Sequence, residues 1–412
     1  MNLNTLAFRN IFRRKRRTLI TASSIAFGVM LSVTFTGSGD YTYTNMIDTG
    51  AKMGMGHVTI QPIGYQEKPT LDKRLVHGYD TLKETLKQSG VSSAVPRIMG
   101  QAMFATAHKS VGGVFIAIDP NLETPDNNVF LQSLVEGKTF TADSRRGVVI
   151  GSKLAEKLKL KLGKKMVYTT TDVSGEIISN ITRVTGIFTS GINMVDSSMV
   201  LLPIKSTQQA LHYSDNEVSL IAVMIHDQRK AKDIRDQLAA LPTNQNNAVL
   251  SWHDAQPDLG GVIAMEEASN IIMQFLIGLL IAAGILNTML MGVLERKREF
   301  GMMMAVGMSP VSLFKLVMVE CFWLALLGLI LGVFITAPWY YFLYTTGIDM
   351  SADLGNGFSY GGVLVDPIFK ARLFPESVFA ILGSVFTLAL AAGAYPAWKA
   401  GSTPPIESLK TI

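Results

Sequence analysis

The chain has 412 residues, of which 48% are hydrophobic and 17% are charged, and its formal net charge is +5. A mean hydropathy of +0.28 is too high for an ordinary soluble protein, while the charged fraction requires a sizeable aqueous part. The single cysteine, Cys321, lies in an apolar stretch, so the aqueous part cannot hold a disulfide.

The chain begins with a basic segment, 1–17, followed by an apolar stretch at 18–38. Such a pair could form a cleaved signal peptide, but the apolar core is longer than a secretory one, so we favour an uncleaved anchor. Acidic lipid headgroups explain the basic cluster better than nucleic acid does. Its members are Arg9, Arg13, Arg14, Lys15, Arg16 and Arg17.

Four apolar stretches are long enough to cross a bilayer core, which needs about 20 helical residues. They predict transmembrane helices at 18–38, 268–294, 310–339 and 376–395. Lys and Arg are retained on the cytoplasmic side of a membrane, and they flank these stretches at both termini and at 296–298. We therefore expect 1–17, 295–309 and 396–412 in the cytoplasm, and 39–267 and 340–375 outside it.

The large segment between the first two spans carries the same pattern twice. A strand, a helix and a strand are predicted at 57–61, 81–88 and 94–98, and again at 217–225, 229–240 and 248–252. Two such units commonly form one split, ferredoxin-like α+β layer, which would unite 57–98 with 217–252. The intervening 100–205 predicts an inserted β-rich subdomain with strands at 100–107, 111–118, 147–150, 166–171, 182–188 and 198–203, and a short helix at 152–160.

Residues 295–307 read ERKREFGMMMAVG and lie between the second and third spans. The polar positions are Glu295, Arg296 and Glu299. Apolar positions recur at i, i+3, i+4 and i+7, which predicts one stripe that can dock into a groove on another protein. The stripe consists of Phe300, Met303, Met304 and Gly307.

The segment 295–307, the elbow between the two spans, is predicted to end sharply. Gly307 suits a left-handed helix end, and Ser309 followed by Pro310 suits the cap and first turn of the next helix.

Several residues inside the spans suggest packing or passage of a ligand. Small residues allow close approach of helices, either within the chain or in a dimer: Gly278, Ala282, Gly284, Gly328 and Gly332. A carboxylate at Glu320 predicts a basic or polar partner, with a proton or substrate role as the alternative. Phe35, Ile271 and Phe275 could line an entrance for a ligand or simply face lipid.

Sequence motifs for catalysis are missing. No G-x-x-x-x-G-K-[ST] occurs, and GVVIGSK at 147–153 has the wrong spacing for cradling phosphates. The six histidines lack the spacing of metal ligands, and there is no Gly-x-Ser-x-Gly elbow. We therefore predict no catalytic residue and no metal site.

The elbow resembles the hallmark of FtsX-like ABC-transporter permeases, in which E-R-x-x-E, then Gly, then Ala-x-Gly forms the coupling helix that contacts the ATPase. The matching residues are Glu295, Arg296, Glu299, Gly301, Ala305 and Gly307. The ending also resembles the family at Tyr395, Pro396, Ala397, Lys399, Ala400, Pro405 and Glu407. A solvated linker is the alternative, but the methionine-rich positions would be poorly placed in one.

The resemblance implies a fold and partners. MacB-type and lipoprotein-releasing (LolC/LolE-like) permeases combine four transmembrane helices with a large extracytoplasmic α+β domain, a porter-like split β-α-β with an inserted β-rich Sabre-like subdomain. The resemblance implies a non-catalytic subunit in the bacterial inner membrane. Its expected partners are an ATPase dimer, which binds ATP and Mg, a second permease copy or paralogue, and membrane lipids. No nucleic acid is implied.

The resemblance leaves the cargo open. The approach 251–267 is more similar to the lipoprotein-releasing permeases, which favours transfer of lipoproteins to a periplasmic carrier. The first alternative is MacB-like efflux of a peptide, toxin or small molecule with an adaptor. The second is FtsX-like signalling to a periplasmic cell-wall hydrolase.

Overall fold

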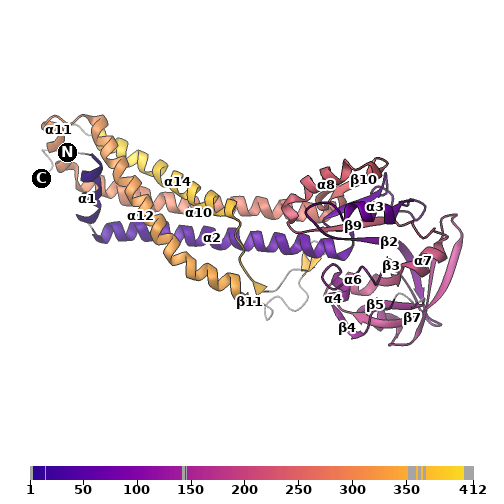
Figure 1. Cartoon of the computed structure of the whole chain (residues 1–412). Helices are drawn as coiled ribbons and strands as arrows, with labels where there is room; N and C mark the ends of the chain where they lie inside the picture. Colours follow the sequence, from indigo (N-terminus) through magenta and orange to yellow (C-terminus); the bar gives the residue numbers. More distant parts are fainter. Residues whose placement is uncertain are drawn as a thin grey trace. The chain divides into compact units, whose positions relative to one another are not determined.

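The structure is a computed structural model that describes residues 3–13, 15–141, 144, 146–350, 359–360, 363–364 and 368–402. The chain divides into two compact units. The helical unit comprises Met1–Tyr41, Met265–Asp349 and Ile368–Ile412, and the sheet unit comprises Thr42–Ala264 and Met350–Pro367. Figure 1 shows the chain coloured from its N-terminus in indigo to its C-terminus in yellow.

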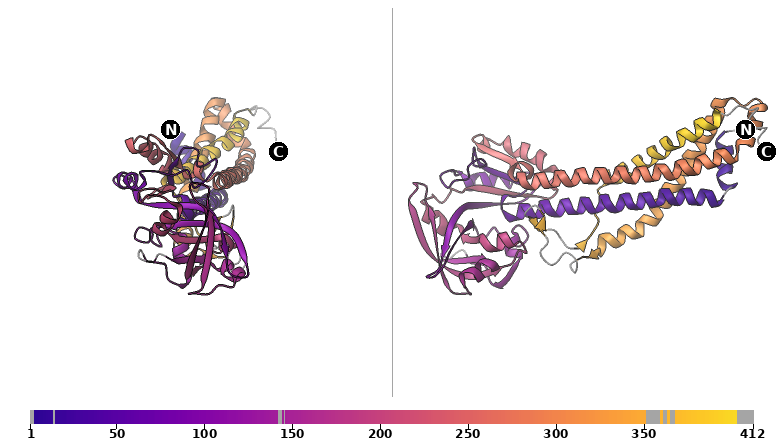
Figure 2. Two further views of the ribbon diagram at one scale, coloured as in Figure 1. Left: turned by 90° about the vertical axis from the view of Figure 1, so that its right-hand side faces the viewer. Right: turned by 180° about the vertical axis from the view of Figure 1, so that it is seen from behind.

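The described residues contain four helices that are long and apolar enough to cross a membrane. These are Lys15–Met55, Pro257–Glu295, Pro310–Thr345 and Pro375–Gly401. The first consists of α2 (Lys15–Gly50) and a π-helical turn, η1 (Ala51–Met55), and the others are α10, α12 and α14. Two shorter helices, α1 (Leu3–Arg13) and α11 (Lys297–Ala305), complete the helical unit. Figure 1 and Figure 2 show the long helices running side by side.

The long helices share one apolar core. On α10 the buried residues Ile277, Ile281, Ile285 and Met289 recur every four positions, as expected for one face of a helix. They pack in a cluster with buried residues of α2, α12 and α14. The remaining faces of these helices carry exposed apolar side chains, which suits a lipid environment.

Small residues on these helices lie where neighbouring helices approach. A Cβ atom added to Gly328 would stand 2.7 Å from the Cβ of Ile25 in α2, and one added to Gly278 would stand 3.1 Å from a methyl carbon of Leu388 in α14. Gly332 meets α2 in the same way as Gly328. The other two small residues, Ala282 and Gly284, are half-buried. A dimer role for the five stays a prediction.

The sheet unit is built on one ten-stranded sheet with the order β10-β1-β9-β2-β3-β8-β5-β7-β4, in which β6 pairs with β2 and β7. The strands are β1 (Val58–Pro62), β2 (Val91–Ala105), β3 (Ser110–Ile118), β4 (Leu134–Gly137), β5 (Gly147–Gly151), β6 (Lys165–Thr171), β7 (Ile177–Phe188), β8 (Met199–Pro203), β9 (Leu220–Ile225) and β10 (Asn247–Ser251). Its helices are α3 (Gly78–Thr85), α4 (Val129–Gln132), α5 (Ser152–Leu158), α6 (Asn193–Ser198), α7 (Ile204–Leu211), α8 (Ala231–Ala239) and α9 (Trp252–Ala255), with short turns η2 (Gln228–Lys230) and η3 (Pro242–Asn244).

The predicted split β-α-β layer is confirmed. β1 lies between β10 and β9, β2 lies on the other side of β9, and all three pairings are antiparallel. Helices α3 and α8 bury Leu82 and Leu238 in the same core as Ile60 and Val223 of the strands.

The inserted segment continues the same sheet, a feature that the sequence pattern did not predict. Strands expected separately at 94–98 and 100–107 are one strand, β2, whose first half pairs with β9 and whose second half pairs with β3 and β6. Gly100 serves close packing there: a Cβ atom would stand 2.7 Å from the ring of Phe115. Only one helix was expected in this segment, so α4 and α6 are additions, and α7 follows directly after β8 at its end.

The predicted segments 340–375 and 396–412 fall partly outside the described residues. In 340–375, α12 continues to Thr345, and short antiparallel pairs form between β11 (Ile348–Asp349) and β14 (Ile368–Phe369) and between β12 (Ser359–Tyr360) and β13 (Val363–Leu364). In the tail, α14 extends to Gly401, while Pro405 and Glu407 lie outside the described residues.

Candidate functional site: the elbow between α10 and α12

The elbow is a short helix with a defined stop at each end. Arg296 leaves helical geometry between α10 and α11, with φ −100° and ψ 12°. At the far end Gly307 has φ 102°, and its N–H donates to the carbonyl of Met304 at 3.0 Å. The N–H of Met308 donates to the carbonyl of Met303 at 3.0 Å, which completes a Schellman motif.

The next helix is capped as its sequence predicts. The Ser309 hydroxyl accepts a hydrogen bond from the N–H of Ser312 at 3.2 Å, and Pro310 takes the first helical position. Only residues 306–309 therefore separate α11 from α12, and their backbone is held by hydrogen bonds.

A buried ion pair joins the start of the elbow to α12. The Nη1 of Arg296 lies 2.9 Å from both carboxylate oxygens of Glu320, and its Nε lies 3.0 Å from Oε2 of Glu299. The guanidinium stands 4.8 Å from the centre of the Phe300 ring. Burial would lower the pKa of Arg296, but the carboxylates of Glu320 and then Glu299 raise it, so the group is charged.

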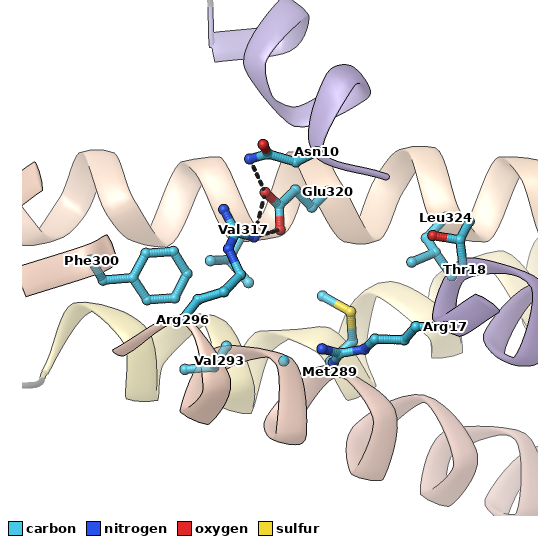
Figure 3. Close-up of a pocket in the computed structure, with 11 residues that line it drawn as sticks. Asn10, Arg17, Thr18, Met289, Val293, Arg296, Phe300, Val317, Glu320 and Leu324 are labelled. Carbon is cyan, nitrogen blue, oxygen red and sulfur yellow. Dashed lines mark hydrogen bonds and ion pairs between the residues drawn. The ribbon is translucent and has the colours of Figure 1, made fainter. Parts of the chain in front are cut away.

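The carboxylate of Glu320 also contacts a third helix, α1. The Nδ2 of Asn10 in α1 donates to Oε1 of Glu320 at 2.7 Å (Figure 3). Helix α1 also rests on α12 through Ala7, which is buried, and through an edge contact of Phe8 with Trp323 at 5.3 Å between ring centres. Glu320, expected from sequence to pair with a basic or polar group, pairs with both.

The carboxylates of the elbow also face basic residues near the N-terminus. Arg13 lies 3.8 Å from Glu299, and Arg17 lies 3.7 Å from Glu295. The guanidinium of Arg17 lies against Gly292, where a Cβ atom would overlap it. Basic and acidic groups from α1, α2, α10 and α11 thus meet at this end of the helical unit.

These side chains surround a small cavity of about 60 Å³. Figure 3 shows Glu320, Arg296 and Asn10 gathered on one part of its wall and Arg17 with Thr18 on another. Its remaining lining is Met289, Gly292, Val293, Phe300, Val317 and Leu324. The volume suits a few water molecules rather than a substrate. In the described part of the chain, no three His, Cys, Asp or Glu residues are grouped so that they could hold a metal ion.

The apolar stripe predicted for docking is covered in part by the chain's own helices. Phe300 is only 2% exposed, Met303 and Met304 are half-buried against the helical core, and Gly307 is exposed. Docking of this stripe onto another protein stays a prediction. The large apolar side chains that the elbow exposes most are Met302 (53%) and Val306 (90%).

The other candidate residues lie elsewhere on the long helices. Phe35 on α2 and Ile271 and Phe275 on α10 are exposed, and the described contacts do not bring them to the elbow. The sequence pattern did not predict the helical form of α1 or the contact of Asn10 with Glu320. The spacing of Leu6, Ala7 and Asn10 on one helical face was the available signal, but the charges around it favoured a basic tail.

Two family models match this chain. The one described as the MacB-like periplasmic core domain matches residues 18–241, and the one described as the FtsX-like permease C-terminal matches residues 271–405. Together they cover most of the sheet unit and the elbow with most of its flanking helices.

Curated relatives match over most of the chain. The lipoprotein-releasing system transmembrane protein LolC of Xylella fastidiosa is 23% identical over 348 residues, which are 76% of this chain and 78% of LolC. The macrolide export ATP-binding/permease protein MacB of Escherichia coli is 26% identical over 351 residues, 80% of this chain, and this chain spans about half of it (51%). The matched part of MacB is the permease part.

Two solved structures align with about half of the chain. The periplasmic region of MacB from Actinobacillus actinomycetemcomitans covers 51% of this chain and 94% of its own length at a TM-score of 0.36 and 15% identity. The extracellular domain of YknZ covers 47% and 98% at a TM-score of 0.33 and 16% identity. The family models and curated relatives show that the chain belongs to the MacB-like and FtsX-like family, as an inner-membrane ABC transporter permease of the MacB, FtsX and LolC type.

Proposed function

We propose that this chain couples ATP hydrolysis by a separate cytoplasmic ATPase dimer to a movement of its sheet unit outside the membrane. Both termini and the elbow face the cytoplasm, since Lys and Arg are concentrated at these three places. ATP and Mg are bound by the ATPase, and a second permease copy or paralogue completes the complex. The cargo need not cross the bilayer.

The exposed face of the elbow carries this proposal. Met302 on α11 and Val306, the residue that follows this helix, are four positions apart, and a Schellman motif fixes this end of the helix. Buried Phe300 holds the opposite face in the helical core. A fixed helix with an exposed apolar face suits docking into a groove on another protein. We propose that this face, flanked by the exposed Arg298, contacts the ATPase.

The first experiment tests this face. Val306→Asp places a carboxylate on the exposed face without disturbing the core, and we expect it to abolish co-purification of the ATPase with the tagged chain from native membranes. Ile177→Asp in the sheet unit, where Ile177 is 78% exposed, is the matched control and should leave co-purification unchanged. Unchanged ATPase recovery with both Val306→Asp and Met302→Asp would remove the elbow from the interface.

For cargo, we propose release of lipoproteins from the inner membrane. LolC, named as part of a lipoprotein-releasing system, matches this chain over 78% of its own length. The exposed Phe35, Ile271 and Phe275 are then candidates for contacts with an acyl chain. MacB, named for macrolide export, matches at a similar level of identity, so efflux is the second candidate.

The second experiment identifies the cargo. The complex is crosslinked from probes in the sheet unit with ATP hydrolysis blocked, captured from its native membrane and analysed by mass spectrometry. Acylated lipoproteins or a lipoprotein carrier are the expected result. An adaptor with an outer-membrane channel would reassign the chain to efflux, and a cell-wall hydrolase would reassign it to signalling.

A further inference from the structure

We infer that the Arg296–Glu320 ion pair is a cross-brace that makes the elbow and α12 move as one rigid body, with Glu320 as its positioning residue. The inference rests on the proposed function, because it assigns how force on α11 reaches the transmembrane helices. It also chooses between the two roles open for Glu320, in favour of transmission and against a proton or substrate site.

The ion pair joins α11 and α12 at points far from the short connection between these helices. Arg296 stands at the α10 end of α11, whereas Glu320 lies about 15 Å into α12 at about 1.5 Å rise per residue. The chain already joins the other end of α11 to α12 through residues 306–309. The pair therefore closes a triangle with α11 as one side, α12 as another and the brace as the third. Without the brace, α11 could pivot about its short connection to α12.

The chemistry of the pair suits a rigid joint. A charged hydrogen bond to a carboxylate is stronger than a neutral one, and here one Arg296 nitrogen contacts both oxygens of Glu320 at 2.9 Å. The side chains of Arg296 and Glu320 are 12% and 10% exposed, which limits competition from water. The Phe300 ring under the guanidinium fixes its position further.

Helix α1 is attached to the same joint. Oε1 of Glu320 accepts from Asn10 as well as from Arg296, so α1, the elbow and α12 share one carboxylate. We therefore expect α1 to follow the elbow when the ATPase moves it.

A proton or substrate role fits this environment less well. Both oxygens of Glu320 already contact cationic or amide donors. The adjoining cavity of about 60 Å³ is far smaller than an acyl chain or a peptide.

The test measures rigidity directly in the complex with its co-purified ATPase. Spin labels at Lys297→Cys on α11, outside the proposed docking face, and at Phe334→Cys on α12 report the distance between the elbow and α12 in a Cys321→Ser background. Lys297 is half-buried, Phe334 is exposed and Cys321 is buried. In the otherwise native chain we expect one narrow distance distribution, unchanged by ATP with vanadate. In Glu320→Gln we expect a broad, nucleotide-dependent distribution, with the population of displaced elbow raised about tenfold.

A double-substitution cycle separates the brace from a general loss of stability. Glu320→Gln, Arg296→Gln and their combination should give the same broadening, because either single change already removes the brace. Glu267→Gln on α10, an exposed carboxylate away from the elbow, is the control and should keep the narrow distribution. Arg296→Lys retains the charge, and we expect it to give a distance distribution of intermediate width. This variant replaces Glu320→Gln in the test if Glu320→Gln does not assemble.

Two results would overturn the inference. One is a narrow distribution in both Glu320→Gln and Arg296→Lys, and the other is additive broadening in the double variant. Either leaves the proposed function intact if Val306→Asp still releases the ATPase. Retention of the ATPase by both Val306→Asp and Met302→Asp would instead reject the proposed function, whatever Glu320 does.

Discussion

Arg97 shows how a single residue joins two parts of the sheet unit. It lies in β2 with no exposed surface, and its guanidinium pairs with Glu123 at 2.6 and 2.9 Å. It also donates to the carbonyl of Gly54 in η1 at 2.6 Å and to that of Asn127 at 3.1 Å. The irregular turn that follows α2 is thus tied to the sheet by a buried charge.

Removing this guanidinium should be strongly destabilising. We expect Arg97→Met to lower the free energy of unfolding by about 3–5 kcal/mol, because it leaves the Glu123 carboxylate buried without its partner. Arg97→Met combined with Glu123→Leu should recover part of the loss, though the carbonyls of Gly54 and Asn127 remain without this donor. Thermal unfolding of the purified full chain in detergent measures both. Equal stability of Arg97→Met and the unchanged chain would contradict the assigned role.

Asp172 gives the sheet unit a dependence on acid pH. The hydroxyl of Ser174 at 2.7 Å is the main cause that lowers its pKa to about 2, and the N–H of Glu176 and the ring of His212 act in the same direction against the opposing effect of burial. The folded pKa lies below the value of about 3.9 for an unfolded chain, so this contribution is complete above pH 4 and is lost as the pH falls to 2.

Substituting Asp172 should flatten this part of the pH profile. We expect Asp172→Asn to be less stable than the unchanged chain at pH 6 and to lose less stability between pH 4 and pH 2, because its side chain does not titrate. Melting temperatures recorded across this range test the prediction. Parallel profiles for the two proteins would argue against it.

At the scale of elements, the packing of α12 on α2 depends on the absence of side chains. We expect Gly328→Ala to cost about 1–3 kcal/mol of stability, because the new methyl would stand 2.7 Å from the Cβ of Ile25. Gly383→Ala on α14, where no atom lies within 4 Å of the added Cβ, is the matched control and should be neutral or slightly stabilising. Thermal unfolding of both variants in the same detergent compares them. Equal effects would mean that helix propensity, not close approach, governs Gly328.

Elements with a strong local signal could be predicted from the sequence. The long apolar runs identified the spanning helices, and Gly307, Ser309 and Pro310 marked the ends of α11 and α12, because caps depend on residues next to one another. The alternating strands of the split β-α-β layer were found for the same reason. Helix α1 was not predicted, because five exposed or half-exposed polar residues surround its short apolar face and hide the helical period.

Features that depend on distant residues could not be predicted in this way. Periodicity placed Phe300 on an apolar stripe, but only the fold decides that this side chain is covered by the chain's own helices. Arg97 and Glu123 are separated by a whole strand, and Arg296, in the turn before α11, is separated from Glu320 by all of α11. The sequence pointed to a partner for Glu320, but not to which arginine would supply it.

On the scale of the whole molecule, the proposed topology assigns opposite sides of the membrane to the elbow and the sheet unit. Four spans return the chain to the side on which it started, so an elbow after the second span shares the compartment of both termini. Cys321, the only cysteine of the chain, is 3% exposed, so the native chain should not react with large maleimides. Single introduced cysteines can therefore report each side without further substitutions.

We predict opposite labelling of two such cysteines by a membrane-impermeant maleimide. In intact spheroplasts, Ile177→Cys in the sheet unit should react at once, because the proposed topology places this unit outside the cytoplasm and Ile177 is highly exposed. Val306→Cys on the elbow, more exposed still, should react only after permeabilisation. The unchanged chain is the control for Cys321. Reaction of both introduced cysteines in intact spheroplasts would contradict a cytoplasmic elbow and with it the docking of a cytoplasmic ATPase, because an apolar face outside the cell cannot receive force from ATP hydrolysis.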